Sequence, residues 1–179
     1  MVMRLTSDSK KGKLSRIISL ESLHTDKTIT ADSHTITMTG YPTPVSGDKR
    51  VGDAWKNGLK YAQQLVVKNK GGKISVVDGT KLKVEDADEI IVLMSAATNY
   101  VQCMDDSYNY FSQEDPLEKV QAMLHKVADK KYTALLATHQ KDYHSLYDRM
   151  RLNLGNLPEA PVAPTDSLLK GDRKSTRLN

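Results

Sequence analysis

The feature of this sequence that most restricts its fold is a succession of strand-like segments joined by tight-turn residues. These segments fill roughly the first hundred residues, with no helical pattern between them. The clearest pair is Lys73–Val77 and Lys81–Val84, which flank Asp78-Gly79. Asp and Gly both tolerate the positive φ that a tight hairpin turn requires. Because strands joined by hairpins form antiparallel sheets, the sequence predicts a mainly β, antiparallel fold.

Further segments of this region have the patterns of strands. Thr35–Thr39 alternates polar and apolar residues with a period of two, which is typical of a strand buried on one face. Glu89–Ala97 contains the uninterrupted apolar run Ile90–Met94, which is typical of a strand buried on both faces. Shorter strands are expected at residues 2–6 and 14–20.

The longest expected strand is Leu59–Asn69. One of its faces is largely apolar, and Gln63 is the exception on that face. The apolar members of this face are Leu59, Tyr61, Leu65 and Val67.

Residues 40–58 contain Gly, Pro, Ser and Asp with little apolar pattern, so we expect a long loop there. Trp55 lies near the end of this loop. An exposed Trp can stack on a sugar ring, which makes Trp55 a candidate substrate-binding residue. The simpler alternative is that Trp55 covers the edge of the β-sandwich.

The pattern changes to a helical one at Asp115-Pro116, which suit the N-cap and the first turn of a helix. Glu118 stands three residues after the cap, where it can reach back to it. A second helix is expected from about Tyr132. The apolar stripes comprise Leu117, Val120, Leu124 and Val127 in the first helix, and Tyr132, Leu135, Leu136, His139, Tyr143, Leu146 and Tyr147 in the second.

The domain organisation follows from these changes of pattern. Residues 1–114 are expected to form a partial N-terminal β-sandwich domain, and residues 115–149 a helical linker segment. Residues 150–155 alternate like a strand that returns to the sheet. Residues 156–171 contain three prolines and should form an extended connector, and residues 172–179 stand apart from the rest.

No metal or cofactor site is expected from the residue types present. His139 and Asp142 have helical spacing, but His144 stands five residues from His139, so an amphipathic helix explains the three residues. Asp105–Asn109 loosely resembles a calcium loop but lacks its glycine and its bidentate acid. Cys103 is the single cysteine, which excludes a disulfide framework, and we expect it to be a small buried residue.

Acids are present, but none of them has the setting that a general acid requires. Glu85, Asp86, Asp88 and Glu89 lie at a hairpin end, where carboxylates are commonly solvated. No acid stands in an apolar environment that would raise its pKa. The sequence also lacks a Ser-His-Asp set and a Gly-rich phosphate loop, so we expect no catalytic residue in this chain.

The formal net charge of +4 does not indicate a nucleic-acid partner. The last eight residues contribute +2 of it, because Arg173, Lys174 and Arg177 outnumber Asp172. The other lysines are scattered among acids, as on a solvated surface. No apolar run is long enough for a transmembrane helix, and the start of the chain lacks the pattern of a signal peptide.

A series of segments in a fixed order is the most specific feature of the sequence. The strongest is Ala87–Tyr100, which is followed by Asp115-Pro116 and then by His139–Tyr143. The other segments are Val2–Asp8, Thr30–Asp32, Ile36–Gly40, Gly58–Ala62, Leu146–Gly155 and Pro164–Asp166. In this order and spacing the segments resemble the N-terminal region of glycoside hydrolase family 95, the α-L-fucosidases, over residues 1–170.

The resemblance implies part of a β-super-sandwich, then a helical linker, then an (α/α)6 barrel outside this chain. Family members release terminal α-linked L-fucose with inversion, and their catalytic carboxylates sit in the barrel. The chain alone should therefore be inactive, and the implied partner of the complete enzyme is a fucosylated glycan or oligosaccharide bound through the barrel. The resemblance also implies a secreted bacterial enzyme, periplasmic or extracellular, that needs no cofactor.

Two features depart from the family pattern. The β domain of the family begins well upstream of Met1, so we expect a truncated fragment that lacks several strands and any export signal. Asp172–Asn179 resembles a translated sequencing adapter, so we expect the native sequence to end near Gly171.

The alternative to an enzyme fragment is a carbohydrate-binding or structural β-sandwich module without catalysis. Trp55 and Tyr41 would then be its stacking platforms. The two expected helices and the Pro-rich connector favour the enzyme fragment, because a binding module needs no helical linker to dock on a barrel.

Overall fold

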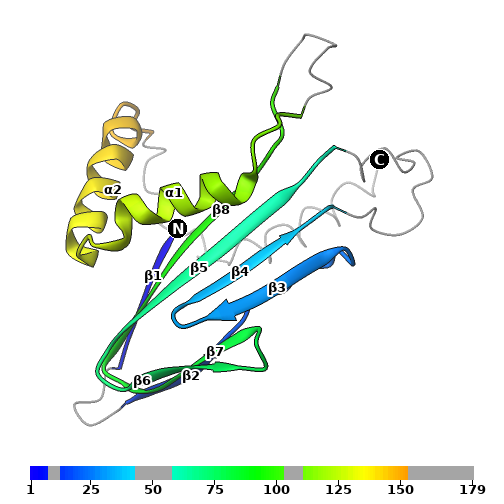
Figure 1. Cartoon of the computed structure of the whole chain (residues 1–179). Helices are drawn as coiled ribbons and strands as arrows, with labels where there is room; N and C mark the ends of the chain where they lie inside the picture. The colour runs from blue at the N-terminus through cyan, green and yellow to red at the C-terminus, as the bar shows by residue number, and fades with distance from the viewer. Residues whose placement is uncertain (8–12, 43–57, 103–110, 153–179) are drawn as a thin grey trace, which may run out of the picture. The chain divides into compact units, whose positions relative to one another are not determined.

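The computed structural model describes residues 1–7, 13–42, 58–102 and 111–152. In these ranges eight strands precede two helices, which confirms the predicted mainly β fold followed by a helical segment (Figure 1). The strands are β1 (Val2–Thr6), β2 (Leu14–Ile18), β3 (Lys27–Asp32), β4 (Thr35–Gly40), β5 (Tyr61–Lys70), β6 (Lys73–Val77), β7 (Lys81–Ala87) and β8 (Glu89–Thr98), and the helices are α1 (Pro116–Ala128) and α2 (Tyr132–Tyr147).

The described strands form two sheets in which neighbouring strands are antiparallel. The larger sheet has five strands in the order β1-β8-β5-β4-β3, and the smaller has three in the order β2-β7-β6. The predicted hairpin is confirmed, with φ of 52° at Asp78 and 65° at Gly79 between β6 and β7. The contacts between residues group the chain into two compact units, Met1–His139 and Gln140–Asn179. Every strand named here lies in the first unit.

A pair of strands passes from the larger sheet into the smaller through one corner (Figure 1). β5 pairs with β8 as far as Lys70↔Glu89, and beyond the corner β6 pairs with β7 from Lys73↔Glu85. Gly72 lies inside this corner with a φ of 66°, and a Cβ there would meet the carbonyl oxygen of Glu85 at 2.0 Å. No residue other than glycine therefore fits where the ribbon bends.

The strand opposite this glycine carries the irregularity that completes the bend. Asp86 of β7 has a φ of 55°, and the pairing of β2 with β7 shifts register between Leu14 and Arg16. An extra residue of this kind bends a strand and increases its twist. The corner therefore folds the smaller sheet back over the larger one.

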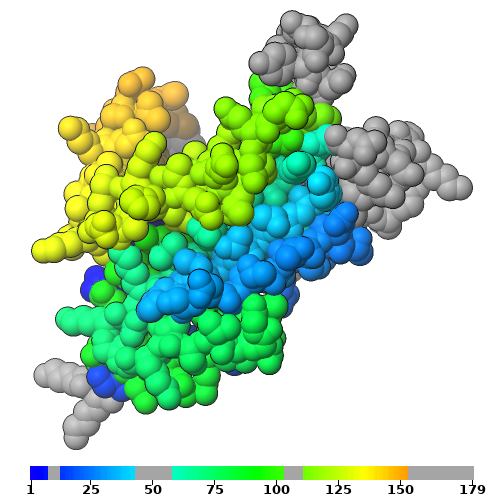
Figure 2. Space-filling view, in the orientation of Figure 1, coloured from blue at the N-terminus to red at the C-terminus, as the bar shows by residue number. Residues whose placement is uncertain are grey.

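The core lies between the two sheets. Ala31 N–H of β3 donates to the carbonyl oxygen of Gly79 at 2.7 Å, so the tip of the β6–β7 hairpin contacts the larger sheet. In the space-filling view the hairpin atoms lie directly against those of β3 and β4 (Figure 2). The buried side chains of this core are Ile36, Leu65, Val67, Ile90 and Val92 from the larger sheet, and Leu82, Val84 and Ala87 from the smaller.

Helix α1 covers the other face of the larger sheet. Val120 and Leu124 pack with Ala62 of β5 and Leu93 of β8, which confirms the predicted apolar stripe of this helix. The Asp115 carboxylate accepts a hydrogen bond from the Leu117 N–H at 2.9 Å and caps the helix as predicted. Because α1 lies on one face and the smaller sheet on the other, β5 and β8 are covered on both faces over part of their length.

Three details differ from the sequence-based expectation or go beyond it. Strand β3 was not predicted, because its alternation is short, and Ile29 and Ala31, its apolar residues, are only partly buried at the edge of the sheet. In β5 the second face is also buried, at Ala62 and Gln64. Of the strand predicted at residues 150–155, Met150–Leu152 lie in no strand, and residues 153–155 lie outside the described ranges, so that strand stays a prediction.

Asn99 joins the segments that enter and leave the larger sheet. Its side chain is 4% exposed. Its Oδ1 accepts from the Lys60 N–H at 2.7 Å, and its Nδ2 donates to the carbonyl oxygens of Gly58 at 2.8 Å and Ser112 at 3.2 Å. One buried amide therefore fixes three separate backbone positions.

The helix layer can be tested by shortening one buried side chain. Leu124→Ala should lower the free energy of unfolding by about 2–5 kcal/mol, because it leaves a cavity between α1 and the sheet. Met123→Ala is the matched control, since Met123 is 54% exposed on the same helix, and its loss should stay below about 1 kcal/mol. Urea denaturation followed by circular dichroism measures both values, and equal losses would contradict this packing.

The role of Asn99 gives a second test. Asn99→Ala should lower the free energy of unfolding by about 1–3 kcal/mol, because it leaves a buried backbone N–H and carbonyl groups without partners. Gln121→Ala removes an exposed amide from α1 and should have almost no effect. Thermal melting of the two variants measures the difference, and a melting temperature of Asn99→Ala equal to that of the unmutated chain would refute the assignment.

Candidate functional site

The acids that stand together in the sequence lie at the corner and have basic partners. Glu85 accepts from Lys83 at 2.7 Å and from Lys73 at 3.3 Å. These lysines hold the pKa of the Glu85 carboxyl below its usual value. A general acid of a glycosidase needs the opposite, a raised pKa. Glu85 is therefore suited to an ion pair and unsuited to proton donation.

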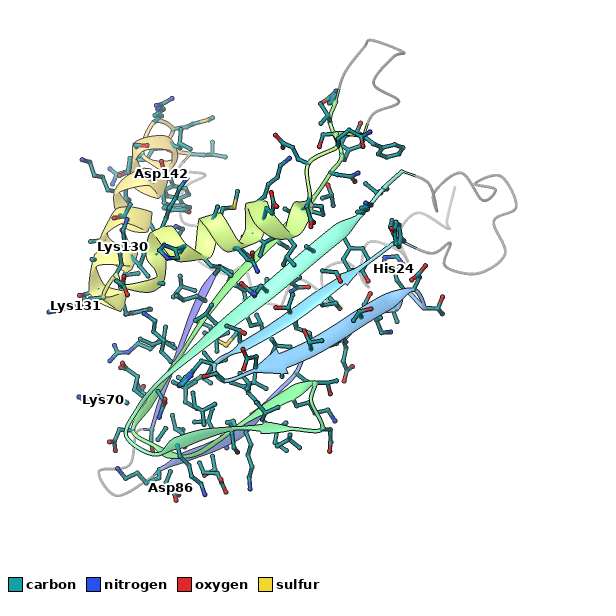
Figure 3. All side chains as sticks on the ribbon, viewed as in Figure 1. His24, Lys70, Asp86, Lys130, Lys131 and Asp142 are labelled. Atoms are coloured by element: carbon teal, nitrogen blue, oxygen red, sulfur yellow. The ribbon has the colours of Figure 1, made fainter. Side chains whose placement is uncertain are left out.

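The neighbouring acids have the same kind of environment. Asp88 pairs with Lys13, and Glu89 accepts from Nε of Arg4 at 2.6 Å. Asp86 is exposed at the corner, where Figure 3 labels it. Three of the four corner acids, Glu85, Asp88 and Glu89, thus pair with basic side chains of neighbouring segments.

The histidines of α2 do not assemble with acids into a metal centre. His144 Nδ1 lies 3.1 Å from Asp148 Oδ2, one helical turn away. The backbone carbonyl of Asp142 accepts from the Ser145 hydroxyl at 2.6 Å. His139 lines an apolar hollow of about 410 Å³ beside Met1, Val2, Tyr132, Leu135 and Leu136. Within the described ranges no three His, Cys, Asp or Glu side chains gather in a way that could hold a metal ion.

Other residues singled out from the sequence lie outside the described part of the chain. These are Trp55, Cys103, the Asp105–Asn109 segment and residues 156–179. Among the helices of the described part, none is long and apolar enough to cross a membrane.

One face of the larger sheet is apolar near the corner and becomes polar toward the other end of its strands, and a hollow lies over the polar end. Near the corner this face of β5 carries Leu65 and Val67, which the smaller sheet covers. Farther along β5 the same face carries Gln63 and then Tyr61, because alternate side chains point to the same side. Tyr61 pairs in register with Thr98 of β8. The apolar surface thus ends where the smaller sheet stops covering it.

A cavity of about 310 Å³ lies over this polar end of the strands. We call it the strand-end hollow. His24 marks its position at the end of the sheet away from the corner residues Lys70 and Asp86 (Figure 3). Its polar lining consists of Glu21, Ser22, His24, Tyr61, Gln63 and Thr98, and its apolar lining of Met38, Pro42 and Leu59.

Two rings form one wall of the strand-end hollow. The centroids of the His24 and Tyr61 rings are 5.6 Å apart, and their planes are inclined at 45°. Lys27 Nζ donates to the carbonyl oxygens of Ser22 at 2.7 Å and His24 at 2.9 Å, which holds the segment that carries His24. A Cβ at Gly40 would lie 2.9 Å from the Tyr61 hydroxyl oxygen, so this glycine leaves room for the ring.

Tyr61 also lines a smaller cavity of about 170 Å³ together with Asp26 and Asp115. The Asp115 carboxylate is engaged as the cap of α1. Because the Asp115 carboxylate is engaged in this way, Asp26 and Asp115 do not provide a free carboxylate pair of the kind that glycosidic cleavage needs. The buried Tyr61 hydroxyl, which lies beside them, has no hydrogen-bond partner among the residues that the structure describes.

His24 and Tyr61 are not predicted as site residues from the sequence. The signal was nevertheless present, because Gln63 interrupts an otherwise apolar strand face. A polar residue at such a position marks the end of the covered core, and the residues beyond it border a cavity.

Comparison with known proteins places the strand region in a family. The sequence model described as Glycosyl hydrolase family 65, N-terminal domain, matches residues 1–103. Alpha-L-fucosidase 2 from Arabidopsis thaliana is 33% identical over 100 residues, which cover 54% of this chain and 11% of that protein. Probable alpha-fucosidase A from Aspergillus niger is 29% identical over 108 residues, which cover 59% of this chain and 14% of that protein.

The matched region is thus more than half of this chain but a small part of either relative. It contains both sheets, including the corner and the strand-end hollow. The predicted resemblance to the N-terminal region of α-L-fucosidases is confirmed, and the chain belongs to the family of glycosyl hydrolase family 65 N-terminal domains.

Proposed function

We propose that this chain is the non-catalytic β domain of a glycoside hydrolase that releases terminal α-linked L-fucose from glycans with inversion. The catalytic carboxylates belong to a helical barrel elsewhere in the complete enzyme, and the helices α1 and α2 begin the linker toward it. The complete enzyme is exported to the periplasm or the cell exterior, where it meets fucosylated glycans. The chain by itself does not cleave them.

The observation that carries this proposal is the environment of the acids. An inverting enzyme needs one carboxylic acid with a raised pKa and one carboxylate about 6.5–9.5 Å away that activates water. At the corner, Glu85 has a lowered pKa, and Asp88 and Glu89 have basic partners. Both relatives are named as α-fucosidases although they match this chain over a small part of their length.

A second candidate function is carbohydrate binding without any catalysis in the complete protein. The strand-end hollow favours this candidate, because aromatic rings and neutral polar groups converge there. The complete gene discriminates between the two candidates. A long helical continuation supports the enzyme, and repeated binding modules support the alternative.

Fucose release distinguishes the chain from the complete enzyme. The complete enzyme should liberate L-fucose from an α-1,2-fucosylated oligosaccharide, and the 179-residue chain at the same molar concentration should liberate none. An L-fucose dehydrogenase assay of the supernatant measures the product. Reproducible release by the chain alone, proportional to its concentration, would refute the placement of the catalytic groups.

A substitution in the complete enzyme tests the role of the corner acids. Glu85→Gln should change kcat on the same oligosaccharide by less than about twofold, because a group that stabilises strand pairing contributes nothing to the transition state. Removal of a true general acid commonly lowers the rate by a factor of about 10²–10⁴. A loss of that size, in a variant that melts at the same temperature as the unmutated enzyme, would identify Glu85 as catalytic.

A further inference from the structure

We propose that the strand-end hollow binds one neutral sugar unit of a glycan. The choice of a glycan as the ligand rests on the proposed function. The position of the site, its size and its preference for an uncharged ligand rest on the described residues alone.

The walls of the strand-end hollow offer the apolar contact that a sugar ring needs. Tyr61 and His24 present two inclined rings at 5.6 Å. The C–H face of a pyranose can pack on the apolar face of an aromatic ring. The hydroxyls of the sugar then point sideways, away from the aromatic ring. Met38, Pro42 and Leu59 add further apolar surface to the same cavity.

The polar groups of the hollow match hydroxyls, which both donate and accept hydrogen bonds. Gln63 donates one amide N–H to the Met94 sulfur at 3.0 Å, and a primary amide has a second N–H and an oxygen besides. The Thr98 hydroxyl accepts from the Tyr100 N–H at 3.3 Å and retains a proton that it can donate. Glu21, from the same segment as His24, adds a carboxylate acceptor to the lining.

Charge selects against the other common classes of ligand. Among the described residues that line the strand-end hollow, none is Lys or Arg, so this lining offers no basic side chain to a phosphate or a nucleic-acid backbone. The nearby Lys27 ammonium already donates to the carbonyl oxygens of Ser22 and His24. Glu21 is the one carboxylate in that lining, which is too few oxygen ligands for a calcium or magnesium ion. A neutral polyhydroxy ligand suits the combination of rings, amide and hydroxyl groups.

The cavity is built on rigid elements, which lowers the entropic cost of binding. Tyr61, Gln63 and Thr98 lie on two paired strands of the sheet. Lys27 clamps the segment that carries His24, and the Tyr41 N–H donates to the Asp26 carbonyl at 3.0 Å beside it. The volume of about 310 Å³ lies at the lower end of the range of about 300–1,000 Å³ found for ligand pockets, which suits a single sugar unit.

Saturation-transfer difference NMR on the full chain tests the proposal directly. The probes are L-fucose, D-galactose and inorganic phosphate, the last with ³¹P line broadening as its readout. At least one of the two sugars should bind, with a Kd in the millimolar range, and phosphate should not. His24→Ala should weaken sugar binding by about threefold to tenfold, because half of the aromatic wall is lost. Tyr61→Phe retains its ring and should weaken binding less than His24→Ala.

Tyr143→Ala is the matched control, because Tyr143 is a 49% exposed tyrosine on α2, and its sugar affinity should equal that of the unmutated chain. Circular dichroism confirms that each variant is folded. Absence of saturation transfer from both sugars to the folded chain would overturn the proposal. Equal affinities for the unmutated chain and His24→Ala, or binding of phosphate in preference to sugar, would also overturn it.

The same variants in the complete enzyme keep the proposal testable if the chain alone does not fold. His24→Ala should then raise the KM for a long fucosylated glycan by about threefold to tenfold relative to Tyr143→Ala. An unchanged KM would overturn the subsite. If the complete enzyme releases fucose but the folded chain binds neither sugar, the proposed sugar site is wrong and the proposed function stands. If the folded chain binds a sugar but the complete enzyme releases no fucose, the proposed function is wrong and the sugar site stands.

Discussion

The bend at one corner of the β-ribbon is the constraint on which the rest of this domain depends. There is no room for a side chain at Gly72, because a Cβ there would lie 2.0 Å from the carbonyl oxygen of Glu85. Asp86, on the opposite strand, adopts a positive φ. This geometry carries two paired strands from one sheet into another and brings their apolar faces together. The ion pairs of Glu85, Asp88 and Glu89 surround the same bend, so the local cluster of acids is explained by the fold.

The length of the folded-back hairpin determines where a binding cavity can exist. The smaller sheet covers Leu65 and Val67 but does not reach Tyr61 at the other end of β5. The part of the sheet face that the smaller sheet does not cover is bordered by the segment that carries His24, and the strand-end hollow lies there. The proposed scaffold role of the domain and its proposed sugar site both follow from one bend, because the core occupies one end of the sheet and the hollow the other.

Local sequence patterns predicted the elements whose signals are local. The Asp78-Gly79 turn, the Asp115 cap and the stripe through Val120 and Leu124 each combine a backbone requirement with a residue type that meets it. The exposed edge strand β3 was missed, because it has few buried residues to form a pattern. The strand-end hollow was missed for a different reason, since it brings residues near position 24 against residues near positions 61 and 98, and such contacts depend on strand order.

The proposed role of this domain is to support catalysis without performing it. The most direct measurement is a crystal structure of the complete enzyme with a non-hydrolysable fucosyl oligosaccharide. The account predicts that the scissile bond lies between two carboxylates that both come from outside residues 1–114. A scissile bond held between two carboxylates of residues 1–114, at the separation that inversion requires, would contradict it.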